Sequence, residues 1–319
     1  MAMDSGRDEQ RTAWPHNLPF AFTVVDDTDF STLTNARPVY DLLLECGMRT
    51  TKTVWPLAPT EAVRTGGATL ADQEYLGWVL ELQASGVEIA YHGATDHTSD
   101  RARSRMALER YGELLGEGPR LYAAHTGQQE ALYWHSDRLA GLPRVLYQAI
   151  QRRRGKCSAS SGHIQGNALF WGDMCRDQIE YMRNFTFVTP NTLSCDRLMP
   201  YHDASRPWVR YWFSASQGQS RRPFCSLISE ANQDALAASG GLCLIYTHFG
   251  AGFAPEGRLD PTFVRLIRRL AGLGGWIAPA STILDHLRSL PGHRDAPKPS
   301  EIRRLEWRWL LGKVRHGAH

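Results

Sequence analysis

Apolar segments of strand length alternate with segments of helical length along most of the chain. The strand-like runs are rich in β-branched and aromatic residues and lie at residues 20–25, 50–55, 87–91, 121–124, 184–188, 209–213, 242–247 and 276–278. Helix signals separate most of these runs, such as Asp260 followed by Pro261 at the start of one helix. This alternation predicts an α/β fold with a mostly parallel sheet, and seven or eight strands fit a barrel.

Residues 151–225 interrupt the alternation and are predicted to be a long insertion. The segment begins basic, continues rich in Ser and Gly, and then becomes rich in aromatic residues and arginine. Within it the pattern predicts one helix, at residues 173–182, before the strand at 184–188. The whole chain is therefore expected to have three regions: a polar tail at residues 1–18, a barrel at 19–290 that includes the insertion, and a basic C-terminal helix and tail at 291–319.

The C-terminal region carries apolar residues at 302, 305 and 309, which lie on one face of a helix. This spacing favours a terminal helix that docks on the barrel and turns its basic face to water. The alternative is a weak contact between the basic face and an anionic membrane surface.

The amino-acid composition limits the classes of protein to which this chain can belong. The chain has 319 residues, of which 42% are hydrophobic and 22% charged, with a net charge of +3. These values are ordinary for a globular protein, and the small net charge argues against nucleic acid as a partner. The six cysteines form no Cys-x-x-Cys pair, and no apolar run reaches the ~20 residues of a membrane span. We therefore expect a cytoplasmic protein with no transmembrane segment.

Carboxylates and imidazoles follow four of the predicted strands. They are Asp26, Asp27 and Asp29 after the first strand, His92 after the third with Asp96 and His97 beyond it, His125 after the fourth, and His248 after residue 247. Because the carboxyl ends of parallel strands meet at one rim, these side chains are expected to converge. Two imidazoles on one short loop and a carboxylate from another strand match an open zinc site with three protein ligands.

The ordered set of motifs resembles the polysaccharide deacetylase family, the NodB-homology or carbohydrate esterase family 4 group. Thr23-Val-Val-Asp26-Asp27-Thr28 resembles its Thr-Phe-Asp-Asp-Gly motif, and His92-Gly-Ala-Thr-Asp-His97 resembles its His-Ser/Thr-x-x-His motif. Leu244-Ile-Tyr-Thr-His248 resembles its late apolar strand that ends in Leu-x-His. The resemblance covers about residues 19–290.

This resemblance implies a distorted (β/α)7-type barrel and a divalent metal, with Zn2+ the expected ion. Asp27, His92 and His97 would bind the metal, Asp26 would be the general base, and His248 the general acid. Two features depart from the family. The histidines are five residues apart instead of four, so either His97 binds through a bulged loop or Asp96 replaces it. The family's Arg-Pro-Pro motif is missing, which leaves the arginine that orients the base unassigned.

Four further residues are predicted to contact a substrate. They are His125 at its strand end and, in the aromatic-rich segment, Trp171, Asp173 and Arg183, because aromatic, acidic and arginine side chains suit sugar rings. The sequence thus predicts a metal-dependent hydrolase that removes an acetyl group from an N-acetylated sugar or a related intracellular metabolite. Two alternatives remain: a carbohydrate-binding barrel without catalysis, and a glycoside hydrolase that uses two carboxylates such as Asp26 and Asp173.

Overall fold

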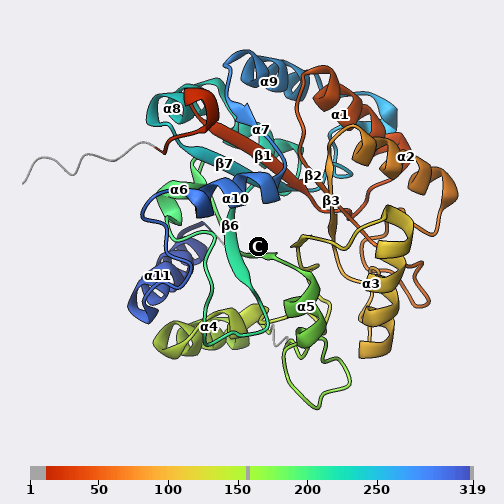
Figure 1. The fold of residues 1–319 in the computed structure, drawn as a ribbon, viewed down its shortest axis with the longest axis vertical. Coiled ribbons are helices and arrows are strands. Elements are labelled where there is room, and N and C mark those ends of the chain that lie inside the picture. Colours follow the sequence, from red (N-terminus) through yellow and green to blue (C-terminus); the bar gives the residue numbers. More distant parts are fainter. Residues whose placement is uncertain (1–11, 156–158, 317–319) are drawn as a thin grey trace, which may run out of the picture.

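Seven parallel strands close a barrel in the computed structural model, which describes residues 12–155 and 159–316. The seven barrel strands are β1 (Ala21–Asp26), β2 (Thr51–Val54), β3 (Glu88–Tyr91), β4 (Leu121–Tyr122), β5 (Tyr181–Phe187), β6 (Tyr211–Gln217) and β7 (Leu242–Thr247), and an eighth strand, β8 (Trp276–Ile277), joins the same sheet. Their order is β2-β3-β4-β5-β6-β7-β1-β8, and the additional pairing of β1 with β2 closes the barrel (Figure 1). The short strand β8 pairs with the beginning of β1. The predicted barrel is therefore confirmed.

Helices surround the barrel, as α/β alternation requires (Figure 1). They are α1 (Leu33–Glu45), α2 (Gln73–Ala84), α3 (Arg101–Leu115), α4 (Gly141–Arg153), α5 (Gly172–Gln178), α6 (Thr192–Cys195), α7 (Arg221–Leu227), α8 (Glu230–Ser239), α9 (Pro261–Gly272), α10 (Ala280–Ser289) and α11 (Pro299–His316). Three 3-10 turns lie at Pro15–Asn17, His135–Arg138 and Pro255–Gly257. Asp260 caps α9, with Pro261 at its first position, as the sequence predicts.

Strand β1 is central to the barrel. It pairs with β7 over six residues, with β2 at its carboxyl end and with β8 at its beginning. All six of its side chains are buried, because strands of a barrel are covered on both faces. The carboxylate of its last residue is therefore inside the protein, where it needs a partner.

Residues 151–225 are not inserted between barrel strands as a separate unit, because they contain the barrel strands β5 and β6. The helix predicted at residues 173–182 ends at Gln178, because Ile179 is already extended and residues 181–187 form β5. The register between β5 and β6 shifts between Arg183 and Thr186. Such irregularities often re-aim side chains beside a site.

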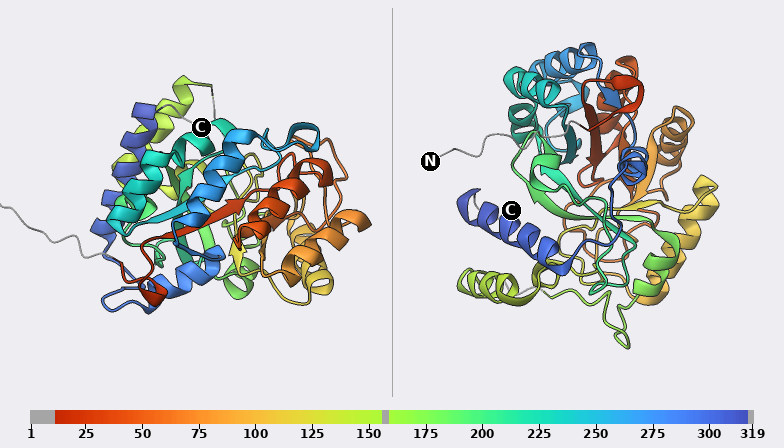
Figure 2. Two further views of the ribbon diagram at one scale, coloured as in Figure 1. Left: turned by 90° about the horizontal axis from the view of Figure 1, so that it is seen from above. Right: turned by 60° about the vertical axis from the view of Figure 1, so that its left-hand side comes forward.

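Helix α11 docks on the barrel with the face that its apolar spacing predicts. Ile302, Leu305 and Trp309 are all buried. Trp309 packs against Phe185 of β5 and Tyr147 of α4, so α11 and α4 lie side by side (Figure 2). In the described part of the chain, no helix has the length and apolar character to cross a membrane. The five described cysteines are free, whereas Cys157 and residues 1–11 lie outside the described residues.

Candidate active site

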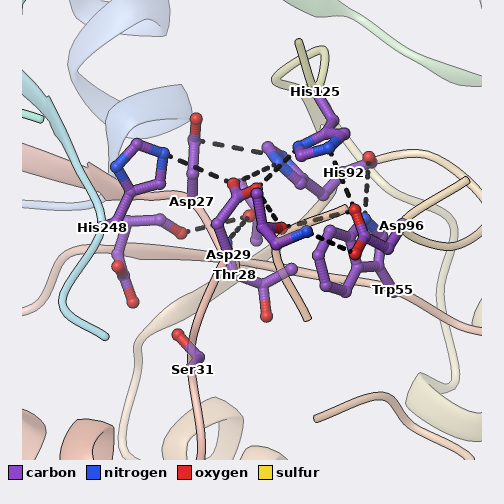
Figure 3. A network of polar contacts seen from close by, with 12 residues as sticks. Asp27, Thr28, Asp29, Ser31, Trp55, His92, Asp96, His125 and His248 are labelled. Atoms are coloured by element: carbon purple, nitrogen blue, oxygen red, sulfur yellow. Dashed lines mark hydrogen bonds and ion pairs between the residues drawn. The ribbon is translucent and has the colours of Figure 1, made fainter. Parts of the chain in front are cut away.

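Asp29 is the centre of the polar cluster at the carboxyl ends of the strands. Its carboxylate lies 2.7 Å from Nδ1 of His125, 3.1 Å from Nε2 of His92 and 3.4 Å from Nε2 of His248 (Figure 3). The four residues come from the ends of β1, β3, β4 and β7, and Asp29 itself is 2% exposed. The parallel barrel thus brings three imidazoles to one buried carboxylate.

The cluster is electrostatically coupled. Burial raises the pKa of Asp29, but hydrogen bonds with His125, His248 and His92 outweigh burial and hold its pKa well below the ordinary value. Burial lowers the pKa of His125, yet its hydrogen bonds with Asp29 and Asp96 raise it to about 9. The site therefore favours an ionised carboxylate that faces positive charge, whether that charge is carried by imidazolium or by a cation.

Asp96 supports the far side of His125. Its Oδ1 lies 3.1 Å from Nε2 of His125, while its other carboxylate oxygen accepts the backbone N–H groups of Arg64, Thr65 and Gly66. A carboxylate held in this way fixes the orientation of a histidine whose other nitrogen faces a metal site. Asp96 therefore lies behind the cluster and positions one of its members.

Asp27 is held by an arginine from the opposite side of the barrel. Arg183 donates from Nη1 to Oδ1 at 2.8 Å and from Nη2 to Oδ2 at 2.6 Å, and both side chains are buried. Asp27 also lies 4.0 Å from Nδ1 of His92. Arg183 lies at the point where the β5–β6 register shifts, and such irregularities often occur beside functional sites. Arg183 thus orients a carboxylate, the role that the missing family motif left unassigned.

Asp26 lies in a separate buried network. Its Oδ2 accepts Nζ of Lys52 at 3.0 Å and the hydroxyl of Tyr40 at 3.1 Å, and its Oδ1 accepts the N–H of Phe249 at 2.7 Å. Burial lowers the pKa of Lys52, but the Asp26 carboxylate more than offsets this effect and raises it. Asp26 and Lys52 are fully buried, and neither lines the cavity described below.

His97 also points away from the cluster. Its Nε2 accepts the N–H of Thr60 at 3.0 Å, and its Nδ1 lies 2.8 Å from the carbonyl of Thr98. These contacts hold the loop after β2 against the loop after β3. The two imidazoles that join His248 beside Asp29 therefore come from two strands, β3 and β4, and not from one loop.

His248 has one nitrogen tied to the backbone and one directed at the cluster. Its Nδ1 donates to the carbonyl of Gln219 at 2.7 Å, which leaves Nε2 facing Asp29. Burial lowers its pKa, but Asp29 and Asp27 raise it above the ordinary value. The geometry suits a group that carries a proton at Nε2.

Trp171 and Asp173 lie outside the cluster. Trp171 is 1% exposed, packs edge-on against Tyr122 and donates from Nε1 to the carbonyl of Glu130 at 2.7 Å. Asp173 accepts both terminal nitrogens of Arg101 at 2.7 Å. Neither residue lines the cavity, so the structure does not bring Asp173 and Asp26 together as the carboxylate pair of a glycoside hydrolase.

A cavity of about 1090 Å³ opens beside the cluster. Asp27, Asp29, His125 and His248 line one end, and it extends between α4 and α11 to Arg138 and Trp309. Such a volume accommodates a ligand larger than one sugar ring. The reactive groups therefore lie at one end of an extended binding site.

The donor set fits a divalent metal. The ligand atoms of Asp29, His92 and His125 lie within 4.8 Å of one another, and those of Asp27, Asp29 and His248 form a second such group. Two imidazoles and a carboxylate are a common ligand set for zinc and other first-row ions. The Nδ1 atom of His92 is buried with no hydrogen-bond partner, and His125 has the supporting carboxylate that metal-bound histidines usually have.

Three functional candidates gained their importance only in the structure. Asp29 was visible as a strand-end carboxylate, but the sequence motif drew attention to Asp26 and Asp27. The sequence places His125 at the end of the fourth strand but predicts that it contacts substrate. Arg183 was also assigned to substrate, and no local signal links it to Asp27, 156 residues away.

Comparisons with known proteins support the fold. No protein-family model matches the sequence, and no curated protein matches it. Among solved structures, the 'putative polysaccharide deacetylase from Mycobacterium smegmatis' is similar with a TM-score of 0.50 at 15% identity, covering 91% of this chain and 97% of that one. Puue allantoinase is similar with a TM-score of 0.52 at 14% identity over the same shares. The resemblance to deacetylases is therefore confirmed at the level of the fold.

Proposed function

We propose that this chain is a metal-dependent hydrolase that removes an acetyl group from an N-acetylated sugar or a related sugar-derived metabolite. The observation that carries the proposal is the convergence of His92, His125 and His248 on Asp29, beside the Asp27–Arg183 pair. The shared fold with a polysaccharide deacetylase supports an N-acetyl sugar as the substrate class. The allantoinase neighbour makes clear that the barrel alone does not fix the substrate.

Asp29, His92 and His125 would hold the metal, and Zn2+ is the ion that this donor set suits. This assignment replaces Asp27 and His97 of the sequence-based prediction with Asp29 and His125. A divalent ion bound here would supply Lewis acidity to an acyl carbonyl and make a water molecule more acidic.

Asp27 would act as the general base in place of Asp26. It lines the cavity beside Asp29, and its two oxygens are fixed by Arg183, so it is positioned to take the proton of an attacking water. Asp26 is instead occupied by Lys52, Tyr40 and Phe249. Arg183 would be a positioning residue, because it acts through Asp27.

His248 would be the general acid. With its Nδ1 proton donated to Gln219, it presents Nε2 to the cavity and can protonate the leaving nitrogen as the C–N bond breaks. Asp29 lies beside the imidazolium that this role requires. Base and acid would thus both lie beside Asp29, within reach of one reacting carbonyl.

The test combines metal analysis with an assay for acetate release from N-acetylglucosamine compounds. We expect about one ion per chain, and we expect Asp29→Asn and His125→Ala to lose the ion and activity together. His97→Ala is the matched control and should keep both, because its ring contacts Thr60 and Thr98. Full activity in a metal-free protein would overturn the proposal, and tight sugar binding without acetate release would favour a binding barrel.

A further inference from the structure

The cavity that contains the candidate active site has a cationic lining. The positively charged side chains that line it are Arg64, Arg138, Arg144, Arg152, Arg183 and Lys313. The carboxylates among its lining residues are each engaged: Asp27 pairs with Arg183, Asp29 lies among the histidines, and Asp137 pairs with Arg144. The lining therefore carries more positive charge than its own carboxylates balance.

Arg138 is the strongest feature of this region. It is 7% exposed and lies at the 3-10 turn before α4. Its Nη1 donates to the carbonyl of Asn184 at 3.1 Å, but its Nε is buried with no hydrogen-bond partner, and it forms no ion pair with any described residue. A buried guanidinium without a carboxylate is costly for the folded protein, so a ligand anion is the natural missing partner.

Two tryptophan rings lie close to the guanidinium of Arg138. Its central carbon lies 3.8 Å from the ring centroid of Trp134 and 5.3 Å from that of Trp309. A guanidinium that lies against aromatic rings can still form hydrogen bonds along its edge, and this planar edge matches the oxygens of a phosphate. The neighbours of Trp134 adopt positive φ angles, 48° at Tyr133 and 54° at His135, and such strained residues cluster at ligand clamps.

The electrostatics around Arg138 favour an anion. The pKa of Arg138 is lowered to about 10, mainly by burial; of its neighbours, Tyr147 raises this pKa, whereas Arg183 and Arg206 lower it. Arg183 and Arg206 each have carboxylate partners, Asp27 for the first and Asp203 and Glu306 for the second. Arg138 stays charged at neutral pH and repels its cationic neighbours, so an anion would relieve an unfavourable interaction.

Strand β5 connects Arg138 with the reacting end of the cavity. Arg183 points to Asp27, and the carbonyl of the next residue, Asn184, accepts Arg138. Both residues lie in the part of β5 where its register with β6 shifts. A ligand that contacts Arg138 can therefore extend along one continuous cavity to Asp27 and Asp29.

We propose that Arg138, which lies against the rings of Trp134 and Trp309, binds a phosphate group of the substrate. The substrate of the proposed hydrolase is then a phosphorylated N-acyl sugar and not a neutral glycan. The choice of substrate class rests on the proposed function, but the phosphate site itself is independent of it. The phosphate can belong to a sugar monophosphate or to a nucleoside diphosphate sugar, because both present the same oxygens to an arginine.

Equilibrium binding at constant ionic strength tests the proposal. The probes are N-acetylglucosamine, its 1-phosphate and its uridine diphosphate conjugate, titrated into the full-length protein. We expect the wild type to bind at least one phosphorylated probe ~10-fold or more tightly than the neutral sugar, the effect of one charge-assisted contact. The phosphorylated probe that binds more tightly shows whether the site prefers the monophosphate or the diphosphate.

Three variants make the test specific to the Arg138 guanidinium. Arg138→Met should remove the preference for phosphate, and Arg138→Lys should keep only part of it, because an ammonium lacks the planar fork. Arg144→Met is the matched control: this residue lines the same cavity but pairs with Asp137, so we expect less than about a threefold change in affinity, within the weak effect of exposed ion pairs. Without ligand, Arg138→Met should melt no lower than the wild type, since it removes an unpaired buried charge.

The outcomes separate this inference from the proposed function. Equal affinity for neutral and phosphorylated probes, or a preference that survives in Arg138→Met, overturns the phosphate site. A preference that Arg138→Met removes supports the site even if no probe releases acetate, and in that case only the proposed hydrolase fails. Equal acetate release from neutral and phosphorylated probes, unchanged in Arg138→Met, overturns the inference and leaves the hydrolase standing.

Discussion

Arg183 and Asp27 form a bidentate ion pair with N···O distances of 2.8 and 2.6 Å, joining strand β5 to the loop after β1 across the barrel mouth. A bidentate pair fixes both oxygens of a carboxylate, so it controls which lone pairs face the cavity. The pair therefore distinguishes Asp27 from its neighbours Asp26 and Asp29, which have different partners.

Asp27→Asn is expected to keep the metal and lose activity. If Asp27 is the base, the asparagine amide that replaces its carboxylate cannot accept a proton, and kcat should fall ~10²-fold to 10⁴-fold. The bound metal, measured by elemental analysis, should stay near the wild-type level because Asp29, His92 and His125 are intact. Loss of the metal in this variant would instead assign Asp27 as a ligand in the group that it forms with Asp29 and His248.

Arg183→Met should remove the ion-pair partner of the Asp27 carboxylate. It leaves Asp27 buried without its partner, which we expect to destabilise the protein by ~3–5 kcal/mol. The double variant with Asp27→Asn should be less destabilised than the sum of the single variants, since no unpaired charge remains. Denaturant titration of all four proteins measures this coupling, and strictly additive losses would contradict it.

Asp26→Asn is expected to affect folding more than catalysis. Lys52 would lose the carboxylate that lies 3.0 Å from its ammonium, at a cost of ~3–5 kcal/mol in the free energy of unfolding. The companion variant Asp26→Asn with Lys52→Met should recover part of this loss. At a temperature where the single variant stays folded, we expect kcat within a few fold of the wild type, and an inactive but fully stable variant would restore Asp26 as the base.

His248→Asn should discriminate between leaving groups. An amide needs a proton on its leaving nitrogen, whereas a nitrophenyl ester releases an anion that needs none. We therefore expect a ~10²-fold or larger loss of kcat on an N-acetyl sugar and a much smaller loss on nitrophenyl acetate. Similar losses on both substrates would point to a ligand or structural role for the imidazole, and His97→Asn is the control that should leave both rates unchanged.

Glu130 is expected to make stability depend on pH. It is 2% exposed, and burial outweighs nearby backbone N–H groups and raises its pKa to about 8. Between the unfolded pKa of ~4.3 and this value the folded state binds the extra proton, so stability falls as pH rises, by up to ~1.4 kcal/mol per pH unit. Glu130→Gln should flatten this slope and melt higher than the wild type at pH 8.

Denaturation in a chelator at pH 5, 6.5 and 8 measures the slope without a contribution from metal binding. Glu113→Gln is the matched control, because this residue is exposed and pairs only with Arg110 across one turn of α3. If Glu130→Gln and the wild type show the same dependence on pH, the buried carboxyl is not its source.

The architecture and the general location of the site could be predicted from local sequence patterns. Alternation of strand-like and helix-like segments reflects local periodicity, and it predicted the parallel barrel and most of its elements. The placement of Asp and His at strand ends predicted the rim, because parallel strands present their carboxyl ends together. Both arguments need only residues that are close in the chain.

Which of these residues act together depends on contacts between distant parts of the chain. Asp26, Asp27 and Asp29 are nearly adjacent, yet Asp26 contacts Lys52, Asp27 contacts Arg183 and Asp29 contacts the histidines. The partners are 26, 156 and as many as 219 residues away, the last being the separation of Asp29 from His248 (248 − 29). Barrel closure sets these pairings, and no local pattern in the sequence encodes a register between distant strands.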